Sequence, residues 1–168
     1  ETLEAGLVQD RSRPHRGGVP ARHVSARRPD VLVRRRTVKA FCRWVDRCVH
    51  PHKVPGYCAV TLTLKKTGVP PGDATADQMD AIAELAERYS FGELRVSHEQ
   101  NLVFADVERR DLFELWNRLV PLGVATPNLG LLTNIISCPG GDFCALANAA
   151  SIPVADAISR RFDDLDYQ

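Results

Sequence analysis

Apolar residues alternate with other residues between Tyr57 and Leu64, and several of them are β-branched, which predicts a β-strand. Thr75 and Gln78 stand three residues apart, as in a capping box, and open a segment of helical apolar spacing that ends near Ser90. The expected apolar face of this helix consists of Met79, Ile82, Ala83, Ala86 and Tyr89.

Two further strands are predicted at 92–97 and 101–104, and a second helix from about Glu108 to Val120. The inward face of that helix should consist of Leu112, Leu115, Trp116 and Leu119. The order β-α-β-β-α is most of a split βαβ, or ferredoxin-like, unit, an α+β fold class, and a last strand is expected around Leu131–Ile136. Since this fold hosts many unrelated functions, the function must be argued from a site.

Residues 1–40 show no sustained period, and only Val31–Val33 resembles a short strand. A basic arm that binds nucleic acid or an anionic partner is one interpretation, although no aromatic residues are interleaved to stack on bases. A disordered N-terminal segment is the second interpretation, and a sequence translated from a shifted reading frame is the third. We favour the second and third interpretations, so this irregular stretch is given no function and no nucleic-acid partner is expected.

Charge divides the chain sharply. Residues 11–53 carry 13 Lys and Arg against two acidic residues, whereas the rest of the chain from Val54 carries 9 against 16. Such a shift predicts a boundary near Lys53–Pro55. We therefore expect an arm at 1–52, a ferredoxin-like half-domain at 53–123 and the start of a further module at 124–168.

A short amphipathic helix is expected within 41–49, because apolar residues recur there at helical spacing. The same region invites a zinc site, with candidate ligands Cys42, Cys48, Cys58, His50 and His52. The spacing does not match the short Cys-x2–4-Cys knuckle of common zinc folds. Cys48 and Cys58 are therefore expected to behave as small apolar residues.

The chain of 168 residues begins at Glu1 and contains Met79 as its single methionine, so we expect a piece of a longer protein. It has no apolar run of transmembrane length and no charged-then-apolar leader, which predicts a cytoplasmic protein without a membrane partner. Five cysteines without a secretory leader favour metal ligation or free thiols over a disulfide framework.

Cys138 and Cys144 stand on either side of a Pro-Gly-Gly turn, a candidate metal–sulfur site. Glycine permits a tight backbone there, and Asp142 is expected to cap a helix start that presents Cys144. A metal site needs about four ligands. Two structural cysteines near a turn therefore remain an alternative.

A second polar group, Arg95, Ser97, Gln100 and Asn101, lies where two predicted strands meet. These side chains are suited to an anionic ligand, since arginine pairs with carboxylates in bidentate fashion. An ordinary hairpin with exposed polar residues is the alternative. The neighbouring His98-Glu99 does not begin a His-Glu-x-x-His zinc motif, because residue 102 is Leu.

Three segments in order, 95–103 (RVSHEQNLV), 126–130 (TPNLG) and 138–147 (CPGGDFCALA), closely resemble the siroheme-dependent nitrite/sulfite reductase family. The resemblance covers about Lys53 to Phe162. It suggests the second ferredoxin-like half of that family followed by the start of its α/β iron–sulfur and siroheme module.

The resemblance implies a 4Fe-4S cluster held in the pattern Cys-x5-Cys…Cys-x3-Cys, with Cys138 and Cys144 as its first two metal ligands. It also implies that Arg95, Ser97, Gln100 and Asn101 approach the siroheme, with Gln100 the leading candidate. The implied activity is six-electron reduction of sulfite to sulfide or of nitrite to ammonia, with ferredoxin or a flavoprotein subunit as electron donor. The second cysteine pair and most substrate-binding residues would lie outside this chain, so this piece alone should be inactive.

Two other function classes stay open. One is a ferredoxin-like binding or regulatory module without a redox centre, in which Cys138 and Cys144 are structural. The other is a zinc-binding protein that uses Cys42, Cys48 and Cys58.

Overall fold

The computed structural model describes residues 39–163, and the expectations for 1–38, including the strand at Val31–Val33, lie outside this part. A four-stranded antiparallel sheet in the order β1-β2-β4-β3 forms its centre. Its strands are β1 (Val49–Pro51), β2 (Tyr57–Leu62), β3 (Arg95–Val96) and β4 (Leu102–Glu108). The helices are α2 (Lys39–Cys48), α3 (Ala76–Tyr89), α4 (Leu112–Leu122) and α5 (Ser151–Phe162), with 3-10 turns at Arg109–Asp111 and Gly140–Asp142.

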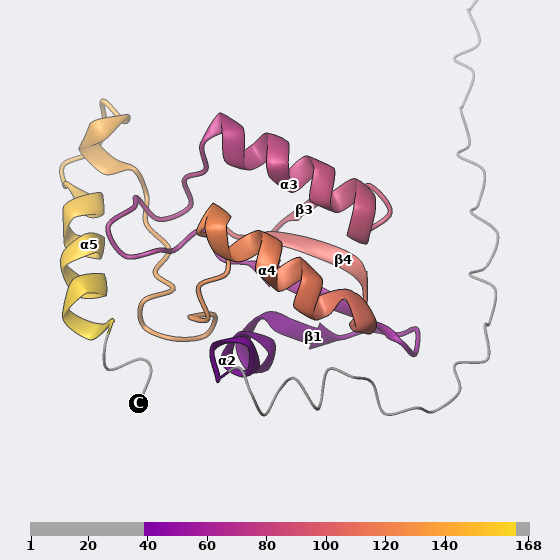
Figure 1. Ribbon diagram of the computed structural model, residues 1–168. Coiled ribbons are helices and arrows are strands. Elements are labelled where there is room, and N and C mark those ends of the chain that lie inside the picture. The colour runs from indigo at the N-terminus through magenta and orange to yellow at the C-terminus, as the bar shows by residue number, and fades with distance from the viewer. Residues whose placement is uncertain (1–38, 164–168) are drawn as a thin grey trace, which may run out of the picture.

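Helices α3 and α4 lie next to each other on the sheet, and α5 stands apart at one end (Figure 1). The predicted capping box is present, because Thr75 Oγ1 accepts the Gln78 N–H and Gln78 Oε1 accepts the Thr75 N–H. The inner face of α3 is narrower than expected. Met79 is 39% exposed and Ala83 also faces solvent, whereas Leu85 packs against the core.

The inner face of α4 agrees with the sequence expectation. Leu112, Leu115 and Leu119 are buried, and Trp116 is partly buried against the same core. The chain leaves this helix at Gly123, whose φ of 74° is the left-handed conformation that glycine adopts without a Cβ penalty. This exit sends the chain back toward the end of β2.

The folded unit begins before Lys53. Strand β1 pairs with β2, with Val49 opposite Val60, and α2 buries Phe41 and Trp44 in the core. The Phe41 ring lies edge-on to Phe113 of α4, with ring centroids 5.1 Å apart. Helix α2 and strand β1 therefore complete the half-domain, whereas the charge boundary would have separated them from it.

The strand expected around Leu131–Ile136 is wrong, because those residues form turns and irregular structure. The segment after α4 meets the end of β2 at an isolated parallel bridge, Thr63 to Ala125, where the Thr63 N–H donates to the Val124 carbonyl at 3.1 Å. The edge of the sheet beside β2 is already occupied by β1. Side-chain hydrogen bonds also hold the chain after Gly123, from Thr63 Oγ1 to the Thr126 carbonyl and from Asn128 Nδ2 to the Lys65 carbonyl.

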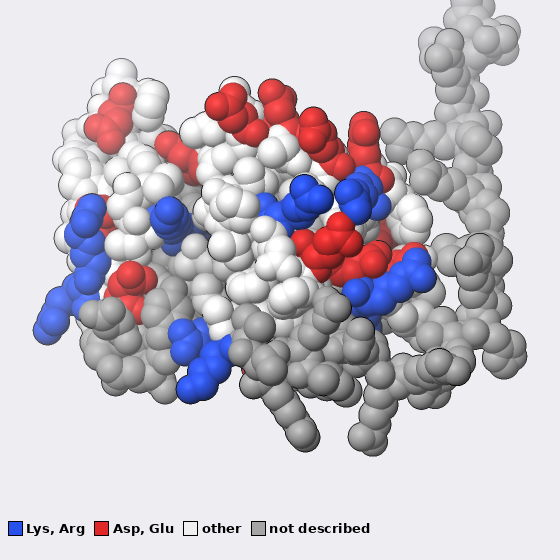
Figure 2. Space-filling view, viewed as in Figure 1, with Lys and Arg blue, Asp and Glu red and all other residues white. Residues whose placement is uncertain are grey.

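Four of the 16 acidic residues in the second part of the chain lie on α3. Acidic side chains form a row over this helix (Figure 2). The exposed members of the row are Asp77, Asp80, Glu84 and Glu87. Among residues 39–163, no helix is long and apolar enough to cross a membrane.

Candidate metal and cofactor site

Cys138 and Cys144 are both exposed and lie on the loop between α4 and α5. The backbone N–H of Gly140 points at the Cys138 sulfur, at a distance of 3.4 Å. Such an N–H stabilises a thiolate, because it places a positive partial charge beside the anionic sulfur. The loop thus offers two accessible sulfur ligands and one donor to a sulfur.

The turn between the cysteines requires glycine at position 140. Gly140 has a φ of 61°, and a Cβ there would lie 2.6 Å from the carbonyl oxygen of Ala149. The Gly141 N–H donates to that same oxygen at 3.1 Å, so the turn is closed onto the segment before α5. The cysteine loop is consequently a defined turn with its sulfurs on the outside.

The expectation that Cys144 opens a helix capped by Asp142 is wrong. A 3-10 turn at Gly140–Asp142 precedes Cys144, and α5 begins at Ser151, seven residues after it. The Cys144 N–H instead donates to the Gly140 carbonyl at 2.9 Å. Helix formation fails here because the left-handed Gly140 and the contact with Ala149 turn the chain away from helical geometry.

The four polar residues of the hairpin are placed very differently from one another. Arg95 is exposed on β3 and pairs with Glu93, with Nε 2.6 Å from Oε1. Ser97 accepts the backbone N–H of Asn101 through its Oγ, at 3.2 Å, which closes the turn between β3 and β4. Arg95 is therefore accessible to a ligand, whereas Ser97 serves its own turn.

Asn101 is fully buried and ties three segments together. Its Oδ1 accepts the Leu64 N–H at 3.1 Å, and its Nδ2 donates to Asn134 Oδ1 at 3.3 Å. Asn134 belongs to the chain that leads to Cys138. Asn101 thus links the hairpin, the end of β2 and the approach to the cysteine loop.

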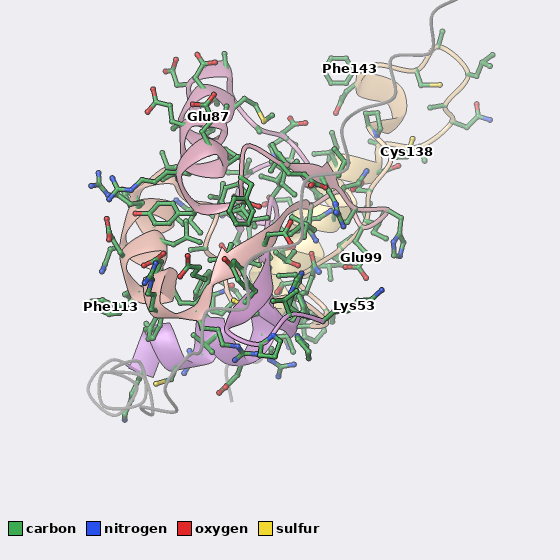
Figure 3. The ribbon with its side chains drawn as sticks, turned by 90° about the vertical axis from the view of Figure 1, so that its right-hand side faces the viewer. Lys53, Glu87, Glu99, Phe113, Cys138 and Phe143 are labelled. Carbon is green, nitrogen blue, oxygen red and sulfur yellow. The ribbon has the colours of Figure 1, made fainter. Side chains whose placement is uncertain are left out.

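Gln100 adopts a left-handed backbone conformation, with a φ of 57°. Its Nε2 donates to the Ser137 carbonyl at 2.9 Å, and its Oε1 accepts the Ser137 N–H at 3.1 Å. Figure 3 shows Glu99, the residue before Gln100, and Cys138, the residue after Ser137, on the same side of the molecule. The structure therefore joins the two sequence motifs, although it aims the Gln100 amide at the protein backbone.

Lys65 is a functional candidate that the sequence analysis missed. Its side chain is buried, and its Nζ donates to Gln100 Oε1 at 3.0 Å. Burial lowers the pKa of this lysine to about 8, and the nearby charge of Glu99 opposes that shift. A lysine directly after a strand of apolar alternation was a visible signal, but the exposed Lys66 beside it looked the same.

A cavity of about 230 Å³ lies where these segments meet. Its lining comes from the 70–73 loop, Gln100, the cysteine loop and α5. Gly72 permits this close approach, because a Cβ there would lie 3.0 Å from the Gln100 Cβ. The cavity places the Gln100 side chain beside the cysteine loop in a space that is partly open to solvent.

The cysteines of the proposed zinc site are not gathered. Cys48 donates to the Thr126 carbonyl at 3.7 Å, and Cys58 donates to the Val107 carbonyl at 3.4 Å. His50 bonds Thr61 and His52 pairs with Asp106. Within residues 39–163, no group of three or more His, Cys, Asp or Glu side chains is placed to hold a metal ion. Cys138 and Cys144 likewise lack further ligands in that part of the chain.

Burial raises the pKa of the Cys48 thiol to about 12 and that of the Cys58 thiol to about 11. A metal ligand must be a thiolate, so both groups are poor ligands where they stand. The structure thus agrees with the expectation that these two cysteines act as small apolar residues. The exposed thiols of the loop are the better candidates.

Comparison with known proteins gives a family match over the half-domain. Residues 50–122 match the family model described as the nitrite/sulfite reductase ferredoxin-like half domain. The chloroplastic ferredoxin–nitrite reductase of Betula pendula is 31% identical over 118 residues, which is 67% of this chain and 19% of that protein. The Oryza sativa subsp. japonica counterpart is 36% identical over 100 residues, 59% of this chain and 16% of that protein.

A relative with a different named electron donor also matches. The nitrite reductase (NAD(P)H) of Emericella nidulans is 25% identical over 99 residues, 58% of this chain and 9% of that protein. The chain spans about a fifth of the length of the first two plant relatives, at 19% in each case. The matches therefore describe one segment of much longer proteins.

Proposed function

Since residues 50–122 belong to the nitrite/sulfite reductase ferredoxin-like half-domain family, we propose that this chain is part of an oxidoreductase that reduces nitrite to ammonia in a six-electron reaction. Nitrite is favoured over sulfite because the relatives named above are nitrite reductases. Ferredoxin is favoured over a flavoprotein subunit as donor, because the plant relatives carry ferredoxin in their names. The cytoplasmic location expected from the sequence stays a prediction.

The proposed cofactors are a 4Fe-4S cluster and siroheme. Cys138 and Cys144 would supply two of the four cluster thiolates, and their exposure and the Gly140 N–H beside Cys138 fit that role. When bound, the cluster and the tetrapyrrole supply single-electron transfer and binding of the anion at iron. Arg95, with its exposed guanidinium, is the residue of the hairpin best suited to a cofactor carboxylate.

One observation carries this proposal. The half-domain is not merely followed by the cysteine loop but bonded to it, through Gln100 to Ser137 and through Asn101 to Asn134. The half-domain that matches the family, residues 50–122, and the two-cysteine loop at 138–144 therefore belong to one structural unit. This supports reading the loop as part of the same cofactor-binding protein.

The test is anaerobic reconstitution of the complete reading frame with iron, sulfide and siroheme. We expect cluster and siroheme absorbance, nitrite-dependent oxidation of reduced ferredoxin, and ammonia as the product. Cys138→Ser should abolish the cluster absorbance, whereas Cys42→Ser should leave it unchanged. If Cys138→Ser keeps the full absorbance, the ferredoxin-like module with structural cysteines becomes the better description.

A further inference from the structure

The amide of Gln100 pairs with Ser137 in the way that one strand residue pairs with another. It donates to the carbonyl and accepts from the N–H of the same residue, at 2.9 Å and 3.1 Å. In an antiparallel ladder, a closely bonded pair exchanges the same two hydrogen bonds. Gln100 thus holds both backbone polar groups of a single residue, Ser137, which directly precedes Cys138.

Lys65 fixes which way the Gln100 amide faces. Its Nζ donates to Gln100 Oε1 at 3.0 Å, so this oxygen accepts from Lys65 and from the Ser137 N–H. A carbonyl oxygen has two lone pairs, and both are used here. A flipped amide would place its NH₂ against an ammonium and a backbone N–H, all of them donors.

The backbone around Gln100 leaves little room for adjustment. A left-handed φ at a residue other than glycine persists only when the surroundings impose it. The Gln100 N–H donates to the Ser97 carbonyl at 3.2 Å, and the Gly72 backbone packs against its Cβ. The side chain therefore works as a rigid arm from the hairpin.

The bonds continue from Ser137 to the first sulfur. Ser137 Oγ donates to the Cys138 carbonyl at 3.1 Å, and two residues later the Gly140 N–H meets Cys138 Sγ. Lys65, Gln100 and Ser137 therefore form a continuous path from the end of β2 to Cys138. The path is carried by side chains of the half-domain, whereas Cys138 itself is exposed to solvent.

We propose that Lys65, acting through Gln100, is a positioning residue for the Cys138 sulfur. This inference rests on the proposed function, in which Cys138 is a cluster ligand. It gives Gln100 a role on the protein side of the site: its amide sets the geometry of the first thiolate. Lys65 orients the Gln100 amide, and this amide in turn fixes the loop that carries the exposed Cys138 sulfur.

The first test measures amide hydrogen exchange at Ser137 by NMR in the 168-residue chain. Lys65→Met removes the ammonium and keeps an apolar stem, Gln100→Leu removes both bonds to Ser137, and Lys66→Met is the matched control. Each lost hydrogen bond weakens protection by about fivefold. We expect exchange at Ser137 to speed up about fivefold in Lys65→Met and more in Gln100→Leu, with no change in Lys66→Met.

A conservative variant and a urea unfolding curve distinguish a local effect at Ser137 from unfolding of the whole chain. Gln100→Glu keeps the acceptor for Lys65 and the Ser137 N–H but cannot donate to the Ser137 carbonyl. Its effect at Ser137 should lie between wild type and Gln100→Leu. Unchanged exchange at Ser137 in Lys65→Met, with a urea transition that shows a folded chain, overturns the inference.

The second test separates positioning from a purely structural role. In the reconstituted complete protein, Gln100→Leu changes no charge, so a shift in the reduction potential or in the EPR signal of the cluster reports altered geometry at Cys138. We expect such a shift, and its absence despite faster exchange at Ser137 overturns the inference. Failure of the proposed function shows differently, as cluster absorbance that survives Cys138→Ser, and leaves the exchange result at Ser137 standing.

Discussion

The side-chain oxygen of Asn101 accepts the backbone N–H of Leu64 at 3.1 Å, and both residues are buried. Leu64 lies just beyond the end of β2, where the ladder with β4 has ended. A buried N–H without a partner is costly, so the amide of Asn101 replaces the missing strand neighbour. The Asn101 side chain therefore lets the chain leave the sheet after Leu62 while the Leu64 N–H keeps a hydrogen-bond acceptor.

Asn101→Leu should therefore destabilise the half-domain, because it removes the acceptor of the Leu64 N–H and the donor to Asn134. We expect a loss of about 2–3 kcal/mol in the free energy of unfolding, measured by urea denaturation. Asn117→Leu on the exposed side of α4 is the control and should stay within about 0.5 kcal/mol of wild type. Equal effects of the two substitutions would contradict the assignment.

Four of the five cysteines should divide into two classes in native alkylation, whereas Cys42 has intermediate exposure. Cys138 and Cys144 are exposed, whereas Cys48 and Cys58 are buried with raised pKa values, which suppress the reactive thiolate. Iodoacetamide at pH 8, followed by peptide mass spectrometry, should label the exposed pair and spare the buried pair. In urea all four should react, which shows that burial is the cause. Labelling of Cys58 as fast as Cys144 in the native chain would refute this division.

Lys65 should make the free energy of unfolding increase at alkaline pH. Its pKa is lowered from an ordinary 10.5 to about 8 in the folded chain, so between these values the unfolded chain binds more protons. Stability then increases with pH across this window, by at most about 1.4 kcal/mol per pH unit. Urea denaturation of wild type and Lys65→Met should show a difference in unfolding free energy that grows in favour of wild type from pH 8 to 10.5.

The comparison with Lys65→Met is needed because the buried thiols act in the opposite direction. The pKa of Cys58 is raised from 9.0 to about 11, so the folded chain holds its proton longer and loses stability as the pH rises above 9. This loss is common to both proteins and cancels in the difference. A difference that stays flat from pH 8 to 10.5 would mean that Lys65 is not desolvated.

Much of the half-domain follows from local pattern. The capping box at Thr75 and the apolar spacing of α4 are set by neighbouring residues, and both were predicted correctly. Strand β1 was missed because it has three residues and ends at Pro51, so it carries too little alternation to be recognised. The strand expected at Leu131–Ile136 was wrong because apolar residues alone do not specify a strand. Strand β2 is already paired on both sides, with β1 and β4, and residues 131–136 form turns and irregular structure.

The sequence motifs of the candidate site were predictable, but the hydrogen bonds that join them were not. Both cysteines and the Arg95–Asn101 hairpin were visible as motifs, but the pairing of Gln100 with Ser137 spans 37 residues and depends on how the chain returns after α4. Lys65 was missed because the sequence does not show whether a lysine is exposed, as Lys66 is, or has its Nζ hydrogen-bonded to a buried amide. Only tertiary packing separates the two.

Gly140 offers a prediction with a close internal control. Gly140 and Gly130 both have positive φ, at 61° and 74°, but a Cβ at Gly130 meets nothing within 4 Å, whereas one at Gly140 meets Ala149 O at 2.6 Å. Both alanine variants carry the left-handed cost of about 1 kcal/mol. Only Gly140→Ala should displace Ala149 O and speed hydrogen exchange at the Gly141 amide. Unchanged exchange at Gly141 would show that the turn is looser than described.

Helix α2 should prove to be part of the folded half-domain. Phe41 is fully buried and its ring contacts Phe113 and Trp116 of α4, with centroids 5.1 Å and 5.5 Å apart. Phe41→Ala should therefore lower the free energy of unfolding by about 3–5 kcal/mol in urea. Lys39→Ala, on the exposed start of the same helix, should change it by less than about 0.5 kcal/mol. If Phe41→Ala unfolds at the wild-type urea midpoint, the folded unit begins after α2, close to the boundary that the charge pattern indicated.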